Sequence, residues 1–217
     1  ILCMNKKITI LVDNESWIDP YAKKLVDILK IKNYDAKLVN EHTLVQEGWI
    51  NFMLGCVSLA SSQTLLKNKY NLVVHESNLP DGKGHAPMAW QILDGKLRIP
   101  ICLIEASNKA DAGNIWLKDV IELNGDELHQ EWRHKQGQKT IDLCINFVEN
   151  YKDINPNPQA HLEGSVVYKK RTVKDSELDI DQSIKKQFNL LRVVDNEKYP
   201  AFFTHHGIKY FLKIYQQ

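Results

Sequence analysis

Short apolar runs alternate with helical patterns along most of the chain. The strand-like runs are β-branched or aliphatic and lie at 8–13, 36–39, 53–59, 71–75, 99–105 and 115–123. Helical spacing of apolar residues is found at 19–33, 61–68, 88–93 and 126–151. Strands that alternate with helices need crossover connections, which are typical of parallel sheets. The pattern therefore predicts an α/β fold with a Rossmann-like, mostly parallel sheet, in which 115–123 is a candidate antiparallel strand.

A second, smaller unit is predicted after Asn155-Pro-Asn-Pro158, because two prolines and two asparagines disfavour both a helix and a central strand. Beyond this linker the pattern predicts a strand at 166–169, an amphipathic helix at 179–192 and a hairpin formed by 201–204 and 208–214. We therefore expect one domain at 1–154 and a small α+β module at 155–217. A unit of about 60 residues is marginally stable alone, so the module is expected to dock on the first domain.

Charge and cysteine usage exclude several classes of protein. The 217 residues include 28 Lys and Arg and 27 Asp and Glu, spread along the chain, so no basic face indicates nucleic acid or an anionic membrane. No apolar run approaches the roughly 20 residues of a membrane helix.

Met4 followed by Asn-Lys-Lys is typical of a natural start, and the fold prediction leaves out 1–3. The four cysteines stand far apart and match no zinc spacing, which predicts reduced thiols, no metal site and a soluble cytoplasmic protein.

Candidate chemistry lies where the run 71–75 ends in His75. Open α/β sheets bind ligands at the carboxyl ends of their strands, and the loop that follows contains Gly82 and Gly84, which let the backbone approach a ligand. Asp111 follows the next strand after a polar loop and is expected at the same edge of the sheet. A carboxylate beside an imidazole stabilises the imidazolium and suits general acid–base catalysis of acyl transfer. The alternative is structural: His75 satisfies nearby backbone and Asp111 caps a turn.

These residues resemble the signature of the folate-dependent formyltransferases. The family form is Asn-x-His-x-Ser-x-x-Pro with a later Asp, and here His75-x-Ser77-x-Leu79-Pro80 is followed by Gly84-x-x-Pro87 and Asp111. The segments HESNLPDGKGHAPMAWQIL, DAGNIWL and RTVKDSELDID are most similar to sugar N-formyltransferases of the pseudaminic-acid pathway type. They are also similar to the formylation domain of a gramicidin-type peptide synthetase. The likeness covers nearly the whole chain.

The resemblance implies a one-carbon transferase whose domain at 1–154 carries 10-formyltetrahydrofolate and whose module at 155–217 helps to hold the acceptor. The implied acceptor is the amine of a nucleotide-linked amino-dideoxy sugar, such as a UDP-4-amino-4,6-dideoxy sugar used in surface glycan biosynthesis. His75 would be the catalytic imidazole and Asp111 its carboxylate partner. The family's asparagine, two residues before the histidine, is replaced by Val73. We therefore expect Asn78, Ser77 or a backbone N–H to stabilise the oxyanion.

The resemblance also places the folate near the end of the strand 99–105, and it implies folate contacts by Ser77, Gly84, Leu103 and Glu105. Lys83 and Arg171 are expected to bind the phosphates of the sugar nucleotide because of their charge. The hairpin leaves an edge strand, and similar formyltransferases are often dimers, so a homodimer is an open expectation. Two other functions stay open: formylation of an aminoacyl group on a carrier, and a non-catalytic folate- or nucleotide-binding module, which the valine at position 73 favours.

Overall fold

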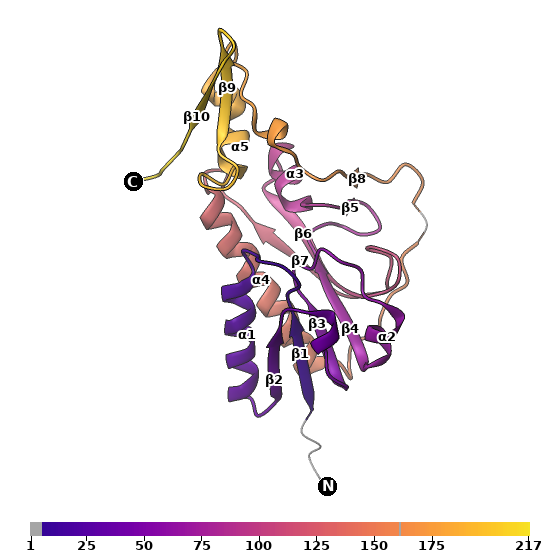
Figure 1. Ribbon diagram of the computed structural model, residues 1–217. Coiled ribbons are helices and arrows are strands. Elements are labelled where there is room, and N and C mark those ends of the chain that lie inside the picture. Colours follow the sequence, from indigo (N-terminus) through magenta and orange to yellow (C-terminus); the bar gives the residue numbers. More distant parts are fainter. Residues whose placement is uncertain (1–5, 161) are drawn as a thin grey trace.

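A six-stranded sheet in the order β2-β1-β3-β4-β6-β7 forms the centre of the molecule (Figure 1). The computed structural model describes residues 6–160 and 162–217, so Cys3 and the predicted start at Met4 lie outside the described residues. The strands are β1 (Lys7–Leu11), β2 (Asp35–Val39), β3 (Gly48–Met53), β4 (Asn68–His75), β6 (Arg98–Glu105) and β7 (Ile115–Glu122). The first four are parallel, whereas β6 is antiparallel to β4 and β7 is antiparallel to β6. The predicted α/β fold with a mostly parallel sheet is confirmed.

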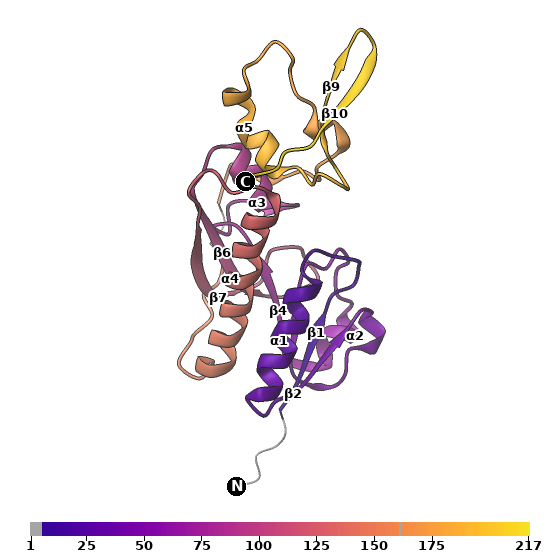
Figure 2. The same ribbon diagram turned by 90° about the vertical axis from the view of Figure 1, so that its left-hand side faces the viewer.

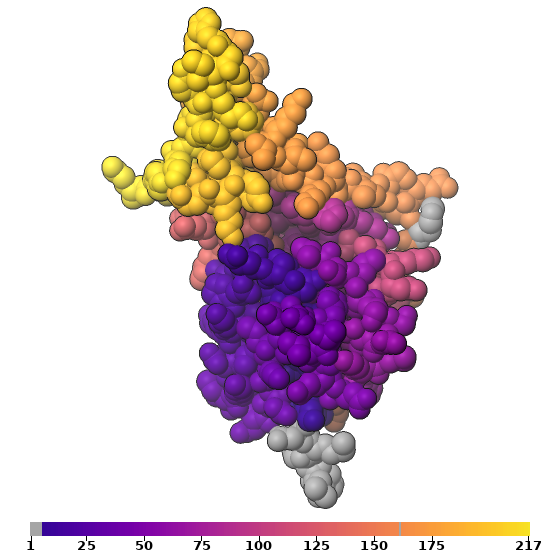
Figure 3. Space-filling view, in the orientation of Figure 1, coloured from indigo at the N-terminus to yellow at the C-terminus, as the bar shows by residue number. Residues whose placement is uncertain are grey.

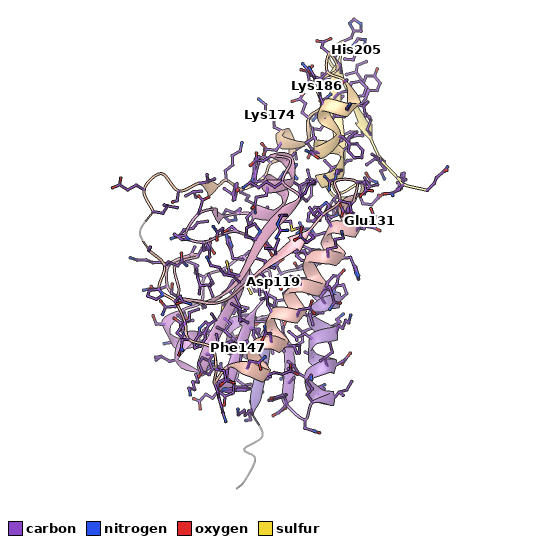
Figure 4. The ribbon with its side chains drawn as sticks, turned by 180° about the vertical axis from the view of Figure 1, so that it is seen from behind. Asp119, Glu131, Phe147, Lys174, Lys186 and His205 are labelled. Atoms are coloured by element: carbon purple, nitrogen blue, oxygen red, sulfur yellow. The ribbon has the colours of Figure 1, made fainter. Side chains whose placement is uncertain are left out.

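Two long helices lie side by side against one face of this sheet (Figure 2). The first, α1 (Asp19–Ile31), has Pro20 in its first turn, where a missing N–H costs nothing, and buries Leu25 and Leu29. The second, α4 (His129–Asn150), runs from Glu131 beside the C-terminal unit to Phe147 at the far end of the sheet (Figure 4). The shorter helices are α2 (Ser62–Leu66), α3 (Pro87–Leu93), η1 (His42–Leu44) and η2 (Val173–Ser176). In the described part of the chain, no helix has the length and apolar character to cross a membrane.

The predicted strand at 53–59 is wrong. The strand that pairs with β1 is β3, which ends at Met53, and residues 54–60 form a loop. The segment is bent by Asp13, which follows β1. The Asp13 carboxylate accepts hydrogen bonds from the backbone N–H groups of Val57 (2.8 Å) and Ser58 (2.9 Å). These bonds fix a bend at Val57 and Ser58, where the apolar side chains of Val57 and Leu59 are exposed, so the hydrophobicity of this segment does not indicate a strand.

Replacement of Asp13 by Asn is expected to lower the free energy of unfolding by about 1–3 kcal/mol near neutral pH. One carboxylate oxygen is replaced by an amide NH₂ group, which cannot accept a hydrogen bond from the backbone. Burial alone raises the pKa of Asp13, but hydrogen bonds from Asn14, Val57, Ser58 and His42 outweigh burial and lower the pKa to about 2. A folded-state pKa below the unfolded value of 3.8 gives stability that is complete above that value and is lost as the pH falls toward 2. Urea titrations at about pH 6 and about pH 2 should show a wild-type advantage over D13N that shrinks at the lower pH. An equal advantage at both pH values would contradict this account.

The C-terminal unit stands on one end of the sheet domain (Figure 3). Its elements are β8 (Val167–Tyr168), α5 (Ile184–Val193) and the antiparallel hairpin of β9 (Ala201–His205) and β10 (Ile208–Leu212). β8 pairs with the two-residue strand β5 (Lys83–Gly84), and α5 packs on α3. The Trp132 indole on α4 donates to the Arg192 carbonyl oxygen (2.9 Å), and the buried Arg192 guanidinium lies 3.1 Å from the Glu127 carboxylate. These contacts dock the unit on the sheet domain, as its small size led us to expect.

Candidate active site

A cavity of about 390 Å³ opens where β3 and β4 end. Its walls come from the segments 53–60, 73–76, 84–89 and 104–111, from Trp17 and Ile18 after β1, and from Arg133, Gln136 and Thr140 on α4. Methionine, isoleucine and alanine side chains of these segments alternate with a few polar groups. Cavities of this size and mixed lining are typical of small-molecule sites.

His75, the last residue of β4, lies on the wall of this cavity and is 5% exposed. Its Nδ1 is 3.4 Å from Oδ1 of Asp111, and its Nε2 is 2.8 Å from the carbonyl oxygen of Gly82. The second carboxylate oxygen of Asp111 accepts the backbone N–H of Gly84 (2.9 Å), which holds the carboxylate in place. Gly84 has φ +103°, and a Cβ there would overlap the carbonyl oxygen of Tyr168. The structure therefore brings together the two residues that the sequence singles out.

The route by which Asp111 reaches His75 differs from the expected one. Because β6 is antiparallel to β4, its last residue, Glu105, lies beside Leu72 and not beside His75. The segment 106–114 then returns along the edge of the cavity and places Asp111, in the left-handed conformation at φ +50°, against the imidazole. The juxtaposition depends on this returning loop and on its contacts with Gly84 and Gln159.

The His75 environment suits proton transfer. A neutral imidazole carries one N–H and can donate to only one of the two oxygens that face its nitrogens, whereas an imidazolium donates to both. The Asp111 carboxylate also compensates the charge of the imidazolium. An imidazole so held can exchange a proton with a group in the cavity when that group displaces one of these two contacts.

The structure places the expected oxyanion donors away from the cavity. The side-chain oxygen of Asn78 accepts a hydrogen bond from Lys118 (3.1 Å) on β7, and Asn78 does not line the cavity. Ser77 is buried beneath Gly82, and its hydroxyl has no partner. Val73 does line the cavity but has no polar side-chain atom. Any hydrogen bond to a developing oxyanion must therefore come from the backbone or from a residue that sequence reasoning missed.

Of the residues expected to bind folate and phosphate, some line the cavity and others do not. Gly84 and Glu105 line the cavity, but the Glu105 carboxylate already accepts from the Asn114 amide (2.9 Å) and the Trp116 indole (3.2 Å). Leu103 is fully buried in the main apolar core. Lys83 lies on β5, and Arg171 lies in the C-terminal unit. Neither of these two cations lines the cavity.

Sequence reasoning missed a row of polar side chains on the wall formed by α4. Arg133 Nη1 donates to Gln136 Oε1 (2.9 Å), and Gln136 Nε2 donates to Glu76 Oε1 (2.6 Å). Glu76 directly follows His75, and both residues line the cavity, so the row borders the same space as the imidazole. Gln136 is 2% exposed although it is polar. The only sequence signal was the helical spacing of Arg133 and Gln136, which is common on any solvated helix.

Comparison with known proteins shows the fold to which this site belongs. No model of a known protein family matches the chain. The methionyl-tRNA formyltransferase of Sulfurihydrogenibium sp. is 27% identical over 129 residues, which are 58% of this chain and 41% of that protein. The chain spans less than two thirds of the length of the curated relatives it matches.

Two solved structures extend the likeness. HypX from Aquifex aeolicus, in complex with tetrahydrofolic acid, matches 97% of this chain and 38% of its own (TM-score 0.78, 17% identity). A sugar N-formyltransferase from a Shewanella species matches 98% of both chains (TM-score 0.69, 12% identity). The chain therefore has the α/β formyltransferase fold, which agrees with the resemblance seen in its sequence.

Proposed function

We propose that this protein transfers a formyl group from 10-formyltetrahydrofolate to the amine of a nucleotide-linked amino-dideoxy sugar. The observation that carries the proposal is the contact between His75 and Asp111 on the wall of a 390 Å³ cavity within a formyltransferase fold. The proposed acceptor is a UDP-4-amino-4,6-dideoxy sugar of the kind used in surface glycans such as those with pseudaminic acid. We place the reaction in the cytoplasm, since the three cysteines of the described ranges form no disulfide.

The lining of the cavity suits a folate donor chemically. Apolar side chains such as Met88 and Ile104 provide flat contact for a pterin ring, and the backbone of 104–106 borders the same space. A neighbour with the same fold binds tetrahydrofolic acid. The donor supplies an activated formyl group when bound. We propose that Gly84 and the backbone near Glu105 contact it, while Ser77 and Leu103 act indirectly, by supporting the loop and the strand from within the core.

In the proposed mechanism His75 moves the proton and Asp111 holds the imidazole. His75 accepts the proton that the acceptor amine loses as it attacks the formyl carbon. It then returns this proton to the nitrogen that carried the formyl group, because that nitrogen must be neutral to leave. Asp111 compensates the positive charge of His75 between the two transfers. Of the groups expected to stabilise the negative charge on the formyl oxygen, we retain a backbone N–H, because Asn78 and Ser77 do not line the cavity.

A sugar acceptor is favoured over RNA by the distribution of charge. The fold comparisons do not separate the two acceptors, since the sugar N-formyltransferase matches 98% of both chains and the methionyl-tRNA formyltransferase of Clostridium thermocellum matches 98% of this chain and 93% of its own. The net charge is only +1, and the Lys and Arg residues are spread along the sequence, whereas RNA binding relies on clustered cations. Lys83 and Arg171 remain the proposed phosphate contacts of the sugar nucleotide.

A panel of acceptors tests the proposal directly. Labelled 10-formyltetrahydrofolate is incubated with the protein and, in separate arms, with a UDP-4-amino-4,6-dideoxy sugar, an aminoacyl thioester and methionyl-tRNA. We expect label to reach the sugar amine alone. Transfer to the thioester or the tRNA would replace the sugar acceptor by that class. Donor binding without transfer in any arm would instead support a non-catalytic folate-binding module.

We also propose that the protein forms a homodimer through its hairpin. The hairpin of β9 and β10 projects from the C-terminal unit (Figure 2), and Tyr210 and Phe211 on β10 are 43% and 61% exposed. Within the described ranges β10 pairs with β9 alone, so its outer edge is available for pairing. Light scattering that gives twice the chain mass would support the dimer, and a mass near 25.1 kDa would contradict it.

A further inference from the structure

The cavity contains a guanidinium that the formyl-transfer mechanism does not use. Arg133 lies on α4 with its guanidinium carbon 4.4 Å from the ring centroids of both Trp17 and Trp132. Nη1 donates to Gln136 Oε1, while Nε is buried and has no hydrogen-bond partner. Arg133 also takes part in none of the ion pairs found among the described residues. The two tryptophan rings hold this cation in place, but no carboxylate neutralises its charge by direct contact.

The two carboxylates that act electrostatically on Arg133, Glu76 and Asp195, are engaged with other groups. Glu76 accepts the Gln136 amide, and Asp195 accepts the backbone N–H groups of Glu197 (2.9 Å) and Lys198 (3.0 Å). Burial lowers the pKa of Arg133 to about 10, and Glu76 and Asp195 offset only part of this effect. The guanidinium is therefore charged at neutral pH. Arg133 is half-buried, and a charge that is partly removed from water without an ion-pair partner is costly, which is usually tolerated where a ligand supplies the partner.

A second guanidinium, that of Arg171 in the C-terminal unit, acts on Arg133 through its charge. The positive charge of Arg171 lowers the pKa of Arg133 and of His129. Arg171 donates to the carbonyl oxygen of Asp175 (3.0 Å), and its Nε is buried without a partner. Arg133 and Arg171 thus each keep a buried N–H donor without a partner, and the charge of Arg171 acts on Arg133, although Arg171 does not line the cavity. Such an arrangement matches a polyanion better than a single carboxylate, because planar guanidinium groups donate paired hydrogen bonds to phosphate oxygens.

We propose that Arg133 binds the diphosphate of the nucleotide-linked acceptor, with the charge of Arg171 in support, and so directs its amine toward His75. This inference rests on the proposed function for the identity of the acceptor. Arg133 would be a binding residue, and the rings of Trp17 and Trp132 would fix the orientation of its guanidinium group. The carboxylates of the folate's glutamate tail are the other anions that could use these donors, so the test includes them as a separate arm.

The experiment measures anion binding without any transfer reaction. Inorganic pyrophosphate and p-aminobenzoylglutamate are titrated into the wild type, R133Q and R133K, and binding is followed by calorimetry and by fluorescence of the adjacent tryptophans. R98Q is the matched control, because Arg98 is an exposed arginine that is paired with Glu122 (2.8 Å) on the sheet edge. We expect the dissociation constant for pyrophosphate to rise about 10- to 100-fold in R133Q and less in R133K, and to be unchanged in R98Q. With the UDP-linked acceptor, R133Q should raise the acceptor KM by a similar factor and leave the donor KM and kcat near the wild-type values.

Each other outcome overturns the inference. Pyrophosphate that fails to bind the wild type, or that binds R133Q as well as the wild type, removes the proposed subsite. Arg133-dependent binding of p-aminobenzoylglutamate alone assigns the guanidinium to the donor. If R133Q fails to fold, R133K and R171Q carry the same comparison. Pyrophosphate binding requires neither the donor nor formyl transfer. Arg133-dependent binding would therefore still be seen if no acceptor were formylated. The proposed subsite and the proposed function can thus fail independently of each other.

Discussion

Replacement of His75 by Ala should lower kcat/KM for formyl transfer by about 10²- to 10⁴-fold, the contribution that general acid–base catalysis makes in enzymes. The imidazole is the cavity-lining group whose Nδ1 faces a carboxylate at 3.4 Å, and no other histidine of the described residues has such a partner at this cavity. Removal of the ring leaves the apolar walls intact, so the affinity for a folate donor should change little. Steady-state transfer of labelled formyl groups, with donor binding measured in parallel, gives both quantities.

Two further variants sharpen the His75 experiment. H75N keeps a polar side chain but cannot carry the proton, and it should be as inactive as H75A. H206A removes an exposed histidine at the hairpin tip and should keep wild-type activity. An H75A enzyme with more than about a tenth of wild-type activity would exclude His75 as the proton carrier.

Replacement of Asp111 by Asn is expected to lower kcat by about 10²- to 10³-fold. The amide can no longer neutralise the imidazolium, although an oxygen remains to accept the N–H of Gly84. The loss should therefore fall on kcat, while the donor KM changes by less than about threefold. Stopped assays at saturating donor and acceptor measure this directly.

The Asp111 prediction has a matched control on the sheet surface. D119N removes a carboxylate of β7 that is paired with Lys139 (2.9 Å) outside the cavity, and it should leave kcat unchanged. Equal losses in D111N and D119N would indicate a general effect of charge or folding. Normal kcat in D111N would show that Asp111 only stabilises the loop around Gly84.

The first part of the site was predictable because it depends on local signals. An apolar run that ends in His75 and is followed by glycines marks the end of a buried strand, where ligands bind. Asp111 was expected beside His75 from its place after the strand 99–105 and from the family resemblance, but the loop that returns it to the cavity is a tertiary feature and was not predictable. The direction of β6, which makes this return necessary, was not predictable from its apolar sequence.

Other features depended on contacts between distant residues and could not be predicted. The loop at 54–60 has a strand-like sequence but is bent by hydrogen bonds to Asp13, more than 40 positions earlier. Arg133 has the sequence context of a solvated helix position, and only the packing of α4 against Trp17 turns it into the cavity. Asn78 was favoured by its proximity to His75 in sequence, but Lys118 of β7 holds it outside the cavity.

A double-mutant cycle of His75 and Asp111 tests the central claim most directly. The value of kcat/KM for formyl transfer is measured in the wild type, H75A, D111N and the variant with both changes. If Asp111 acts through the imidazole, adding D111N to H75A should cause no further loss beyond about twofold. If the two losses multiply, or if the wild type transfers no formyl group at all, the two residues do not form the catalytic pair proposed here.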